Sequence, residues 1–453
     1  MYCCDVALFG LFLQPLSCQF PMELIEILIL ISSFAVLLTL GVPVAYSIGL
    51  ASMITMLVGI LPLAAVTTLA QRMATGLDSF ALLAIPFFIL AGQFMNRGGI
   101  AIRLVDFAKT LVGMLPGGLV YVNILACMLF GAISGSAVAA ASAIGGFMGP
   151  RMADEGYDKA FSAAVNITSS TTGMIIPPSN ILIVYSLASG GVSIAALFVA
   201  GYLPGILLGL SLMVVAGIMA WRRGYRTGGG FKLRQVGQKG LQALPSLLLL
   251  FIVIGGIVGG VFTATEASAI AVVYTAVLAM MVYKEVKIKD LPAMLLDTAN
   301  TTAVVMILIS TSTGMSWVMS YENIPQAVSN AMLAVSDSPI VVLLLINLIL
   351  FIVGTFMDMT PAVLIFTPIF LPVVTTLGMD PIHFGIVMVT NLCIGLCTPP
   401  VGSVLFVGCG VAGVSIDKVI RPILPLFLAM LGALVLITYW PALSLWLPKL
   451  LGL

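Results

Sequence analysis

The chain has 453 residues, of which 61% are hydrophobic and 8% are charged, and its formal net charge is +1. Soluble domains carry roughly 25% charged residues, so this composition excludes a soluble protein and places the chain in a lipid bilayer. The apolar runs are continuous rather than alternating, which predicts membrane helices, with about eleven to thirteen membrane-embedded segments.

The first 21 residues contain no basic segment and no convincing cleavage site, so they are not typical of a signal peptide. Met22 begins the first clean apolar span. We therefore expect residues 1–21 to be an N-terminal extension that is disordered or results from a mis-assigned start. Residues 22–78 are predicted to form the first scaffold helices.

The chain matches itself at an offset of 222 residues. Residues 150–194 align with residues 372–416 without a gap, and 12 of these 45 positions are identical. The matched residues include the helix breakers Pro150, Gly173 and the pair Pro177-Pro178. The offset predicts two copies of one unit, at residues 79–221 and 301–453, joined by residues 222–300.

Each copy has the same order of segments. An apolar span leads to a short amphipathic piece, at 97–109 in the first copy and 322–337 in the second. An interrupted apolar segment, a Gly-x-Asp turn, a segment broken at Pro-Pro and a final span follow. Because transporters with a site at the membrane midplane commonly use inverted repeats, we expect the copies to have opposite orientations. The predicted fold class is an all-α polytopic membrane protein with two inverted repeats, re-entrant helical hairpins and Pro-broken helices.

The connecting region carries the clearest orientation signal. Residues 222–239 contain six Lys and Arg residues and no acid, which predicts that this loop is cytoplasmic. Lys284, Lys287 and Lys289 indicate a second cytoplasmic loop. The apolar stretch 243–283 between them is therefore predicted to cross and return. Gly255-Gly256 with Gly259-Gly260 gives a place near its middle for the chain to turn or for helices to pack closely.

Four interruptions of apolar sequence are predicted to form the functional site. They are the segments 134–136 and 176–180 in the first copy and 358–361 and 398–402 in the second. A proline inside a helix removes a hydrogen bond and displaces a carbonyl, and such backbone persists at membrane depth only where protein or a water-filled cavity satisfies it. Carbonyl and hydroxyl oxygens suit sodium, and the N-termini of half-helices suit an anion. The alternative interpretation is that Pro-Pro only kinks a helix and Ser-Gly-Ser only allows tight packing.

The candidate residues are taken from these interruptions. The candidate sodium ligands are Ser134, Gly135, Ser136, Ile176, Pro177, Gly354, Asp358, Thr360, Thr398 and Pro399. The candidate substrate-binding residues are Ser136, Ser179, Asn180, Thr360, Gly402 and Ser403.

Asp358 stands out because it lies inside an apolar run, where a carboxylate is a functional hypothesis by default. A helix N-cap is the alternative role. Its counterpart at the 222-residue offset is Ser136, so the two copies are expected to build related but unequal ion sites. Asp158 and Asp380 are interpreted as helix caps, Glu266 as a cap or an interhelical partner, and His383 as structural.

The sequence contains no catalytic triad, nucleotide-binding loop or transition-metal signature, and nothing in it points to a nucleic-acid partner. We therefore expect neither an enzyme nor a cofactor, and transport would use an ion gradient. A proton-coupled organic-anion carrier with Asp358 as the relay is the alternative to sodium coupling. A channel fits less well, because paired broken helices suit an occluded site. A membrane enzyme fits least well, because the sequence shows no nucleophile-base or metal constellation.

Five segments, in this order, resemble the large membrane subunit of tripartite ATP-independent periplasmic (TRAP) transporters: Phe130–Ala137, Ile175–Ser179, Thr263–Ala267, Gly354–Asp358 and Asn391–Gly402. The resemblance covers about residues 22–447. It implies a sodium-driven elevator that imports an organic acid, such as a C4-dicarboxylate or sialic acid, across the bacterial inner membrane. It also implies a small membrane (Q) subunit and a periplasmic substrate-binding (P) protein as partners. Asn180 and the pair Ser403-Val404 depart from the usual family pattern, and both could alter the substrate pocket.

Overall fold

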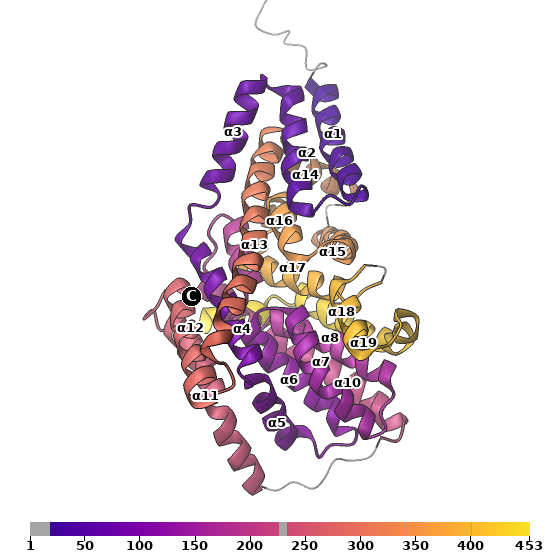
Figure 1. The fold of residues 1–453 in the computed structure, drawn as a ribbon. Helices are drawn as coiled ribbons and strands as arrows, with labels where there is room; N and C mark the ends of the chain where they lie inside the picture. Colours follow the sequence, from indigo (N-terminus) through magenta and orange to yellow (C-terminus); the bar gives the residue numbers. More distant parts are fainter. Residues whose placement is uncertain (1–18, 226–232, 337, 400) are drawn as a thin grey trace, which may run out of the picture.

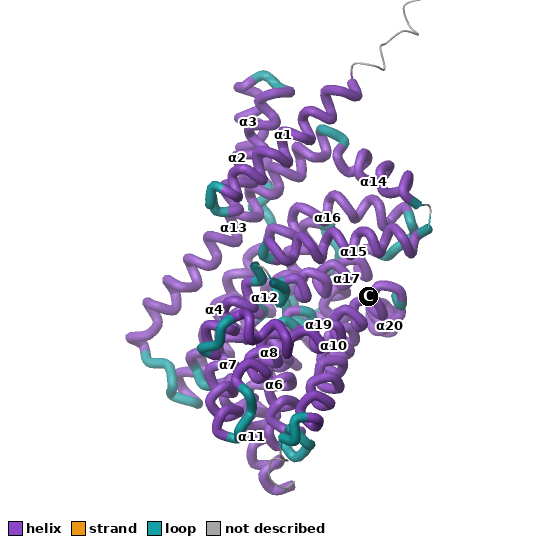
Figure 2. Tube along the Cα trace, turned by 90° about the vertical axis from the view of Figure 1, so that its right-hand side faces the viewer, coloured by secondary structure: helices purple, strands orange, loops and turns teal. Residues whose placement is uncertain are grey.

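The computed structural model describes residues 19–225, 233–336, 338–399 and 401–453, and within these ranges it contains only helices and loops (Figures 1 and 2). Most of the predicted extension 1–21, much of the basic loop and Pro400 lie outside the described residues. Eight described helices are long and apolar enough to cross a membrane. The fold class predicted from the sequence is confirmed as an all-helical polytopic membrane protein.

One group of helices lies outside the two copies. It contains α1 (Gln19–Thr39), α2 (Val44–Gly59), α3 (Pro62–Thr75), α11 (Leu233–Val258) and α12 (Ala264–Val277). Helices α1 to α3 form the upper end of the molecule in Figure 1, and α11 reaches its lower end. The predicted turn between the basic segments is present: Gly260 adopts a φ of 67°, and α12 begins with a capping box formed by Thr263 and Glu266.

Each copy begins with a long helix followed by a shorter amphipathic one, which we call the arm helices. They are α4 (Ala84–Arg97) and α5 (Ile100–Val112) in the first copy, and α13 (Leu291–Tyr321) and α14 (Ile324–Val335) in the second. Helix α4 packs against α12 and α13, and α13 also packs against α2, α3 and α16. The arm helices therefore connect the outer helices to the rest of each copy.

The remaining helices of each copy form a hairpin, a broken helix and a final span. In the first copy these are α6 (Gly118–Ser134), α7 (Ala137–Asp154), α8 (Lys159–Ser170), α9 (Asn180–Ala188) and α10 (Ile194–Arg222). In the second they are α15 (Pro339–Phe356), α16 (Met359–Thr376), α17 (Pro381–Gly395), α18 (Ser403–Ala412) and α19 (Ile416–Tyr439), followed by α20 (Ala442–Leu450). Helices α7 and α16 occupy corresponding residues at the 222-residue offset from end to end.

The two hairpins approach the centre of the molecule from opposite ends. In Figure 1, α5, α6 and α7 lie in the lower half, whereas α14 and α16 lie in the upper half. Figure 2 shows α15 and α16 side by side with α14 above them. This arrangement is the inverted repeat expected from the sequence.

Local caps begin the broken helices, as the sequence predicted. Asp158 Oδ1 accepts a hydrogen bond of 2.8 Å from the backbone N–H of Phe161, and Asp380 Oδ1 accepts one of 2.8 Å from that of Ile382. Such side-chain caps replace hydrogen bonds that the first turn of a helix cannot make internally. Both aspartates therefore act as helix caps.

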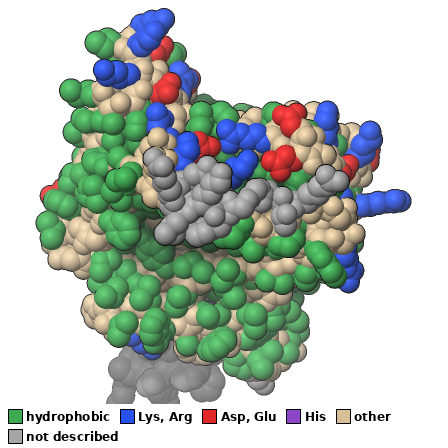
Figure 3. Space-filling model, turned by 90° about the horizontal axis from the view of Figure 1, so that it is seen from below, with side chains coloured by type: hydrophobic (Ala, Val, Ile, Leu, Met, Phe, Trp, Pro, Cys, Tyr) green, Lys and Arg blue, Asp and Glu red, His purple; other side chains and the backbone are tan. Residues whose placement is uncertain are grey.

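Charged side chains gather on the lower face of the molecule, whereas apolar side chains cover most of the rest of the same view (Figure 3). Asp106 of α5 accepts a hydrogen bond from Lys239 of α11 at 2.9 Å and forms an ion pair with Arg151 of α7 at 3.5 Å. Arg223, next to the basic loop, pairs with Asp158 at 3.6 Å. These pairs join α5 to α7 and α11, and the end of α10 to the start of α8.

Candidate functional site

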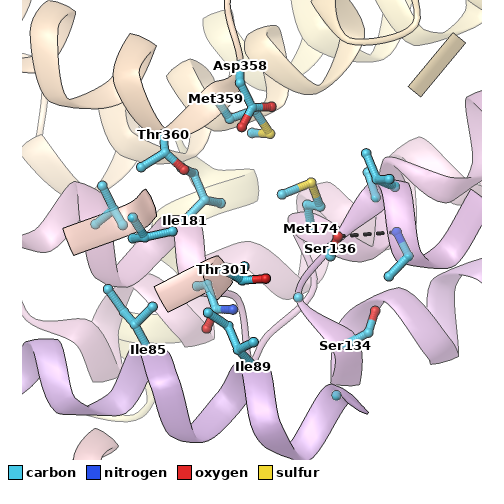
Figure 4. Close-up of a pocket in the computed structure, with 18 of the residues that line it drawn as sticks. Ile85, Ile89, Ser134, Ser136, Met174, Ile181, Thr301, Asp358, Met359 and Thr360 are labelled. Atoms are coloured by element: carbon cyan, nitrogen blue, oxygen red, sulfur yellow. Dashed lines mark hydrogen bonds between the residues drawn. The ribbon is translucent and has the colours of Figure 1, made fainter. Parts of the chain in front are cut away.

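The tip of the first hairpin is a tight turn of small residues. Helix α6 ends at Ser134, and Gly135 adopts a φ of 60°, a left-handed conformation that residues with a Cβ rarely adopt. Ser136 then caps α7, because its Oγ accepts a hydrogen bond of 3.2 Å from the backbone N–H of Ala139 (Figure 4). The Ser-Gly-Ser sequence thus turns the chain sharply inside the protein.

The tip of the second hairpin is built differently. Asp358 occupies the N-cap position of α16 but makes no side-chain capping hydrogen bond. Its side chain is exposed, while Thr360 is half-buried and Met359 is buried. Capping therefore does not account for the Asp358 carboxylate.

The broken helices supply the other two interruptions. Regular helix stops at Ser170 and resumes at Asn180 in the first copy, and it stops at Gly395 and resumes at Ser403 in the second. The intervening backbone cannot make the hydrogen bonds of a continuous helix, so both breaks place polar backbone inside the protein.

Glycine pairs bring each hairpin against the broken helix of its own copy. A Cβ on Gly131 would lie 2.7 Å from Cα of Gly173, and a Cβ on Gly395 would lie 2.5 Å from the carbonyl carbon of Gly354. No real side chain fits at such distances. The duplicated contact holds each hairpin close to the break in its copy.

The two tips face one cavity of about 300 Å³ (Figure 4). The cavity is lined by Ser134, Gly135 and Ser136 of the first tip and by Asp358, Met359 and Thr360 of the second. The arm helices close another side, with Ile85, Ile89, Gly92, Gln93 and Asn96 of α4 and Thr301 and Val305 of α13. The cavity therefore lies between the hairpins and the arm helices.

Two buried oxygens at this cavity have no hydrogen-bond partner. They are Oγ of Ser134, whose side chain is 7% exposed, and Oδ1 of Asn180 at the start of α9. An unpartnered buried acceptor is costly unless something else satisfies it. Hydroxyl, amide and carboxylate oxygens such as these and that of Asp358 are hard ligands of the kind that suits a cation such as sodium.

Six of the predicted site residues meet in this cavity: Ser134, Gly135, Ser136, Asn180, Asp358 and Thr360. The other candidates lie outside its lining. Ile176 and Pro177 face α10 near Gly205 and Gly201, and Gly354 packs against α17. Thr398 lies in the second break and donates its hydroxyl to the carbonyl oxygen of Ile394 in α17 at 2.9 Å. Pro399 and Gly402 lie in the same break, and Ser403 begins α18. Ser179 is fully buried beside Asn180, and its Oγ is also unpartnered.

The sequence reasoning missed the contribution of the arm helices. Gln93 and Asn96 are three residues apart on α4, so they share a helix face, and both line the cavity. Two amides at this spacing on an apolar helix are the signal that was present in the sequence. In the described part of the chain, no cluster of three or more His, Cys, Asp or Glu side chains could hold a metal ion.

Comparison with known families agrees with this architecture. Residues 31–443 match the family described as tripartite ATP-independent periplasmic transporter, DctM component. The chain belongs to this family. Like its relatives in the TRAP family, it is a transporter permease subunit embedded in the membrane. It is not an enzyme.

Relatives of this TRAP subunit come from several bacteria. The chain is 56% identical to the uncharacterized protein YgiK of Salmonella typhimurium, over 94% of this chain and 97% of YgiK. It is 42% identical to the C4-dicarboxylate TRAP transporter large permease protein DctM of Pseudomonas aeruginosa, over 90% and 95% of the two chains. The sialic acid TRAP transporter large permease protein SiaM of Vibrio cholerae is 39% identical, over 84% and 89%.

The fold of the TRAP subunit is also found in a solved transporter structure of low sequence identity. The YdaH transporter of Alcanivorax borkumensis is 14% identical and superimposes with a TM-score of 0.64, covering 84% of this chain and 89% of YdaH. At this identity the likeness concerns the fold alone.

Proposed function

We propose that this chain is the large permease subunit of a tripartite system that imports an organic acid across the bacterial inner membrane, driven by a sodium gradient. One observation carries the proposal: a carboxylate and unpartnered buried oxygens from the two inverted copies face a single cavity. The C4-dicarboxylate and sialic acid relatives support the substrate class, since both of those compounds are organic acids.

The cavity contains the two kinds of group that such co-transport requires. Asp358 and the oxygen of Ser134 suit a cation. The N-terminus of α9 begins at Asn180, and that of α7 begins beside Ser136, so two helix dipoles present their positive ends to the same space. A bound sodium ion would add positive charge next to the substrate, so that each ligand favours binding of the other.

The position of the cavity supports an elevator movement. The hairpins and broken helices pack on one another, while α4 and α13 close the cavity from the scaffold side. Gly92 lets α4 lie close to the tip of the first hairpin, because a Cβ on Gly92 would lie 3.3 Å from the carbonyl oxygen of Ser134. We propose that the hairpins and broken helices slide as a body past the arm helices and carry the cavity across the membrane.

The proposed assembly follows from the family. The DctM component belongs to a tripartite transporter, so a small membrane subunit and a periplasmic substrate-binding protein are the proposed partners. The basic loop at residues 222–239 would then face the cytoplasm.

The test is uptake into proteoliposomes that contain the chain with its small membrane subunit, supplied with its binding protein and radiolabelled C4-dicarboxylates or sialic acid. We expect uptake that requires an inward sodium gradient and that falls in Asp358→Asn. Asp380→Asn is the matched control, because Asp380 caps α17 away from the cavity and Asn caps helices equally well. Uptake that persists without sodium under an imposed proton gradient would overturn sodium coupling and favour Asp358 as a proton relay.

A further inference from the structure

A second cavity, of about 290 Å³, lies behind the first hairpin. It is enclosed by α6, α7, α8 and α18 and shares no lining residue with the cavity between the tips. Its polar lining residues are Asn123, Lys159, Ser162 and Asn166. None of its lining residues is acidic, so its charge differs from that of the first cavity, which contains Asp358.

The amide of Asn123 is oriented by its neighbours. Its Oδ1 accepts a hydrogen bond from Cys127 Sγ at 3.5 Å and lies 3.2 Å from Ser169 Oγ, whose hydroxyl also donates to the carbonyl oxygen of Val165. Because the thiol donates to Oδ1, the Nδ2 group carries the remaining capacity of the side chain, as two N–H donors. Asn123 is 1% exposed and lines the cavity, and no described residue accepts a hydrogen bond from its Nδ2.

Asn166 adds a second amide donor. Its Nδ2 donates to the carbonyl oxygen of Ala141 on α7 at 2.8 Å, and its Oδ1 lies 3.7 Å from Cys127 Sγ. One N–H of Asn166 therefore remains, and the residue is 4% exposed at the cavity wall. The two buried amides present donors without matching acceptors, a combination that suits an anion.

Lys159 supplies the positive charge. It is exposed at the start of α8, on the same face as Arg223. Of the three acids that closely precede it in the chain, Asp158 pairs with Arg223 and Glu155 pairs with Lys109, while Asp154 forms no ion pair among the described residues. In the described ranges no carboxylate lies within ion-pair distance of Lys159.

The size and walls of the cavity favour a carbon skeleton over a simple inorganic ion. The volume of 290 Å³ is about ten times the roughly 30 Å³ that one water molecule occupies in the liquid. The space beside Gly149 is open, because a Cβ there would meet no atom within 4 Å. Ala163 and Val411 provide apolar walls.

We propose that this second cavity binds a small organic carboxylate from the face that carries Arg223, with Lys159, Asn123 and Asn166 holding the carboxylate oxygens. If the proposed function holds, this ligand is the transported acid on the side of release. A carboxylate bound between α7 and α8 would fix the first hairpin against its broken helix. Accumulated product would therefore slow further import.

The site is tested by cysteine protection in detergent. Gly149→Cys is introduced into a cysteine-free background in which Cys127→Ser keeps a donor to Asn123, and labelling by a small neutral maleimide is timed with and without succinate. A ligand at ten times its dissociation constant would slow labelling about tenfold. Choline chloride at equal ionic strength should give no protection.

Variants assign the effect to this cavity. We expect Lys159→Gln and the isosteric Asn123→Asp to abolish protection by succinate. Lys418→Gln, an exposed lysine on α19, and Thr360→Ala at the first cavity should retain it. Protection that survives Lys159→Gln, that disappears in Thr360→Ala, or that comes from phosphatidylglycerol vesicles but not from succinate would overturn the proposal.

Transport measurements distinguish a failure of the second binding site from a failure of the proposed function. In proteoliposomes, succinate inside the vesicles should slow uptake in the wild-type protein and should slow it less in Lys159→Gln. Sodium-driven uptake with no protection at Gly149→Cys would refute the second site alone. Protection without any uptake would refute the proposed function and leave the site standing.

Discussion

The two hairpin tips occupy equivalent positions in the repeats, but different kinds of residue form the turn in each. The first uses a left-handed glycine and a serine whose side chain caps the following helix. The second has no left-handed residue, and its aspartate makes no capping hydrogen bond. In the first tip the polar side chain supports the backbone, whereas in the second it remains available to a ligand. The duplication thus preserved the backbone path and let the side-chain chemistry diverge.

The largest effect of this difference is expected at Asp358. Asp358→Asn removes the negative charge and keeps the shape, so sodium activation should weaken by about 1.5–3 kcal/mol, roughly ten- to hundredfold. The measurement is the sodium dependence of uptake. The melting temperature should stay unchanged, because the carboxylate makes no capping bond. Unaltered sodium activation would contradict an ion-binding role.

The next largest effect is expected at the glycine contacts behind the tips, where substitution should affect the stability of the two copies unequally. Gly131→Ala would place a Cβ 2.7 Å from the backbone of Gly173, whereas Gly354→Ala would place one 3.2 Å from the Leu392 side chain and 3.3 Å from the nearest backbone atoms. Overpacking should cost about 1–3 kcal/mol at Gly131 and less at Gly354. Thermal unfolding in detergent measures both, with Gly146→Ala as the control, since a Cβ there would meet nothing within 4 Å. Equal losses at the two glycines would show that the contacts are equivalent.

Gly135→Ala tests the left-handed turn of the first tip. A side chain at a φ of 60° should destabilise the protein by about 1–2 kcal/mol. Met357→Ala at the second tip provides the comparison for a turn without such a residue. Hydrogen exchange of the first hairpin should report the change locally, and unaltered protection there would contradict the expected strain.

The smallest effect is expected for Ser136→Ala. Loss of the cap on α7 should reduce the free energy of unfolding by about 1 kcal/mol. Ser136→Asp keeps a capping oxygen and should restore stability, and it also reproduces the residue type of the second tip. If neither variant changes stability, the tips do not differ in the way described.

Much of this architecture could be predicted from local sequence. The Gly and Pro interruptions mark both tips and both breaks, because those residues disrupt helices wherever they occur. The offset of 222 residues then places the four interruptions in two equivalent pairs. Asn180 and Thr360 were predicted from the same interruptions, and both line the cavity.

The parts that could not be predicted depend on packing between distant segments. Ile85 and Thr301 line the cavity because α4 and α13 cross beside the tips, and no local pattern specifies that crossing. Ser403 starts a broken helix as Asn180 does, yet only Asn180 reaches the cavity. The second cavity arises where α18 passes over Gly145 and Gly149, which no short motif records.

The equal placement of α7 and α16 limits how this protein can change in length. One residue inserted into either helix would move its tip by about 1.5 Å and rotate it by roughly 100° about the helix axis. Ser136 or Asp358 would then turn away from the other tip. Insertions and deletions should accordingly be tolerated in the basic loop and excluded from the hairpins, so both return helices should keep their 18 residues in functional homologues.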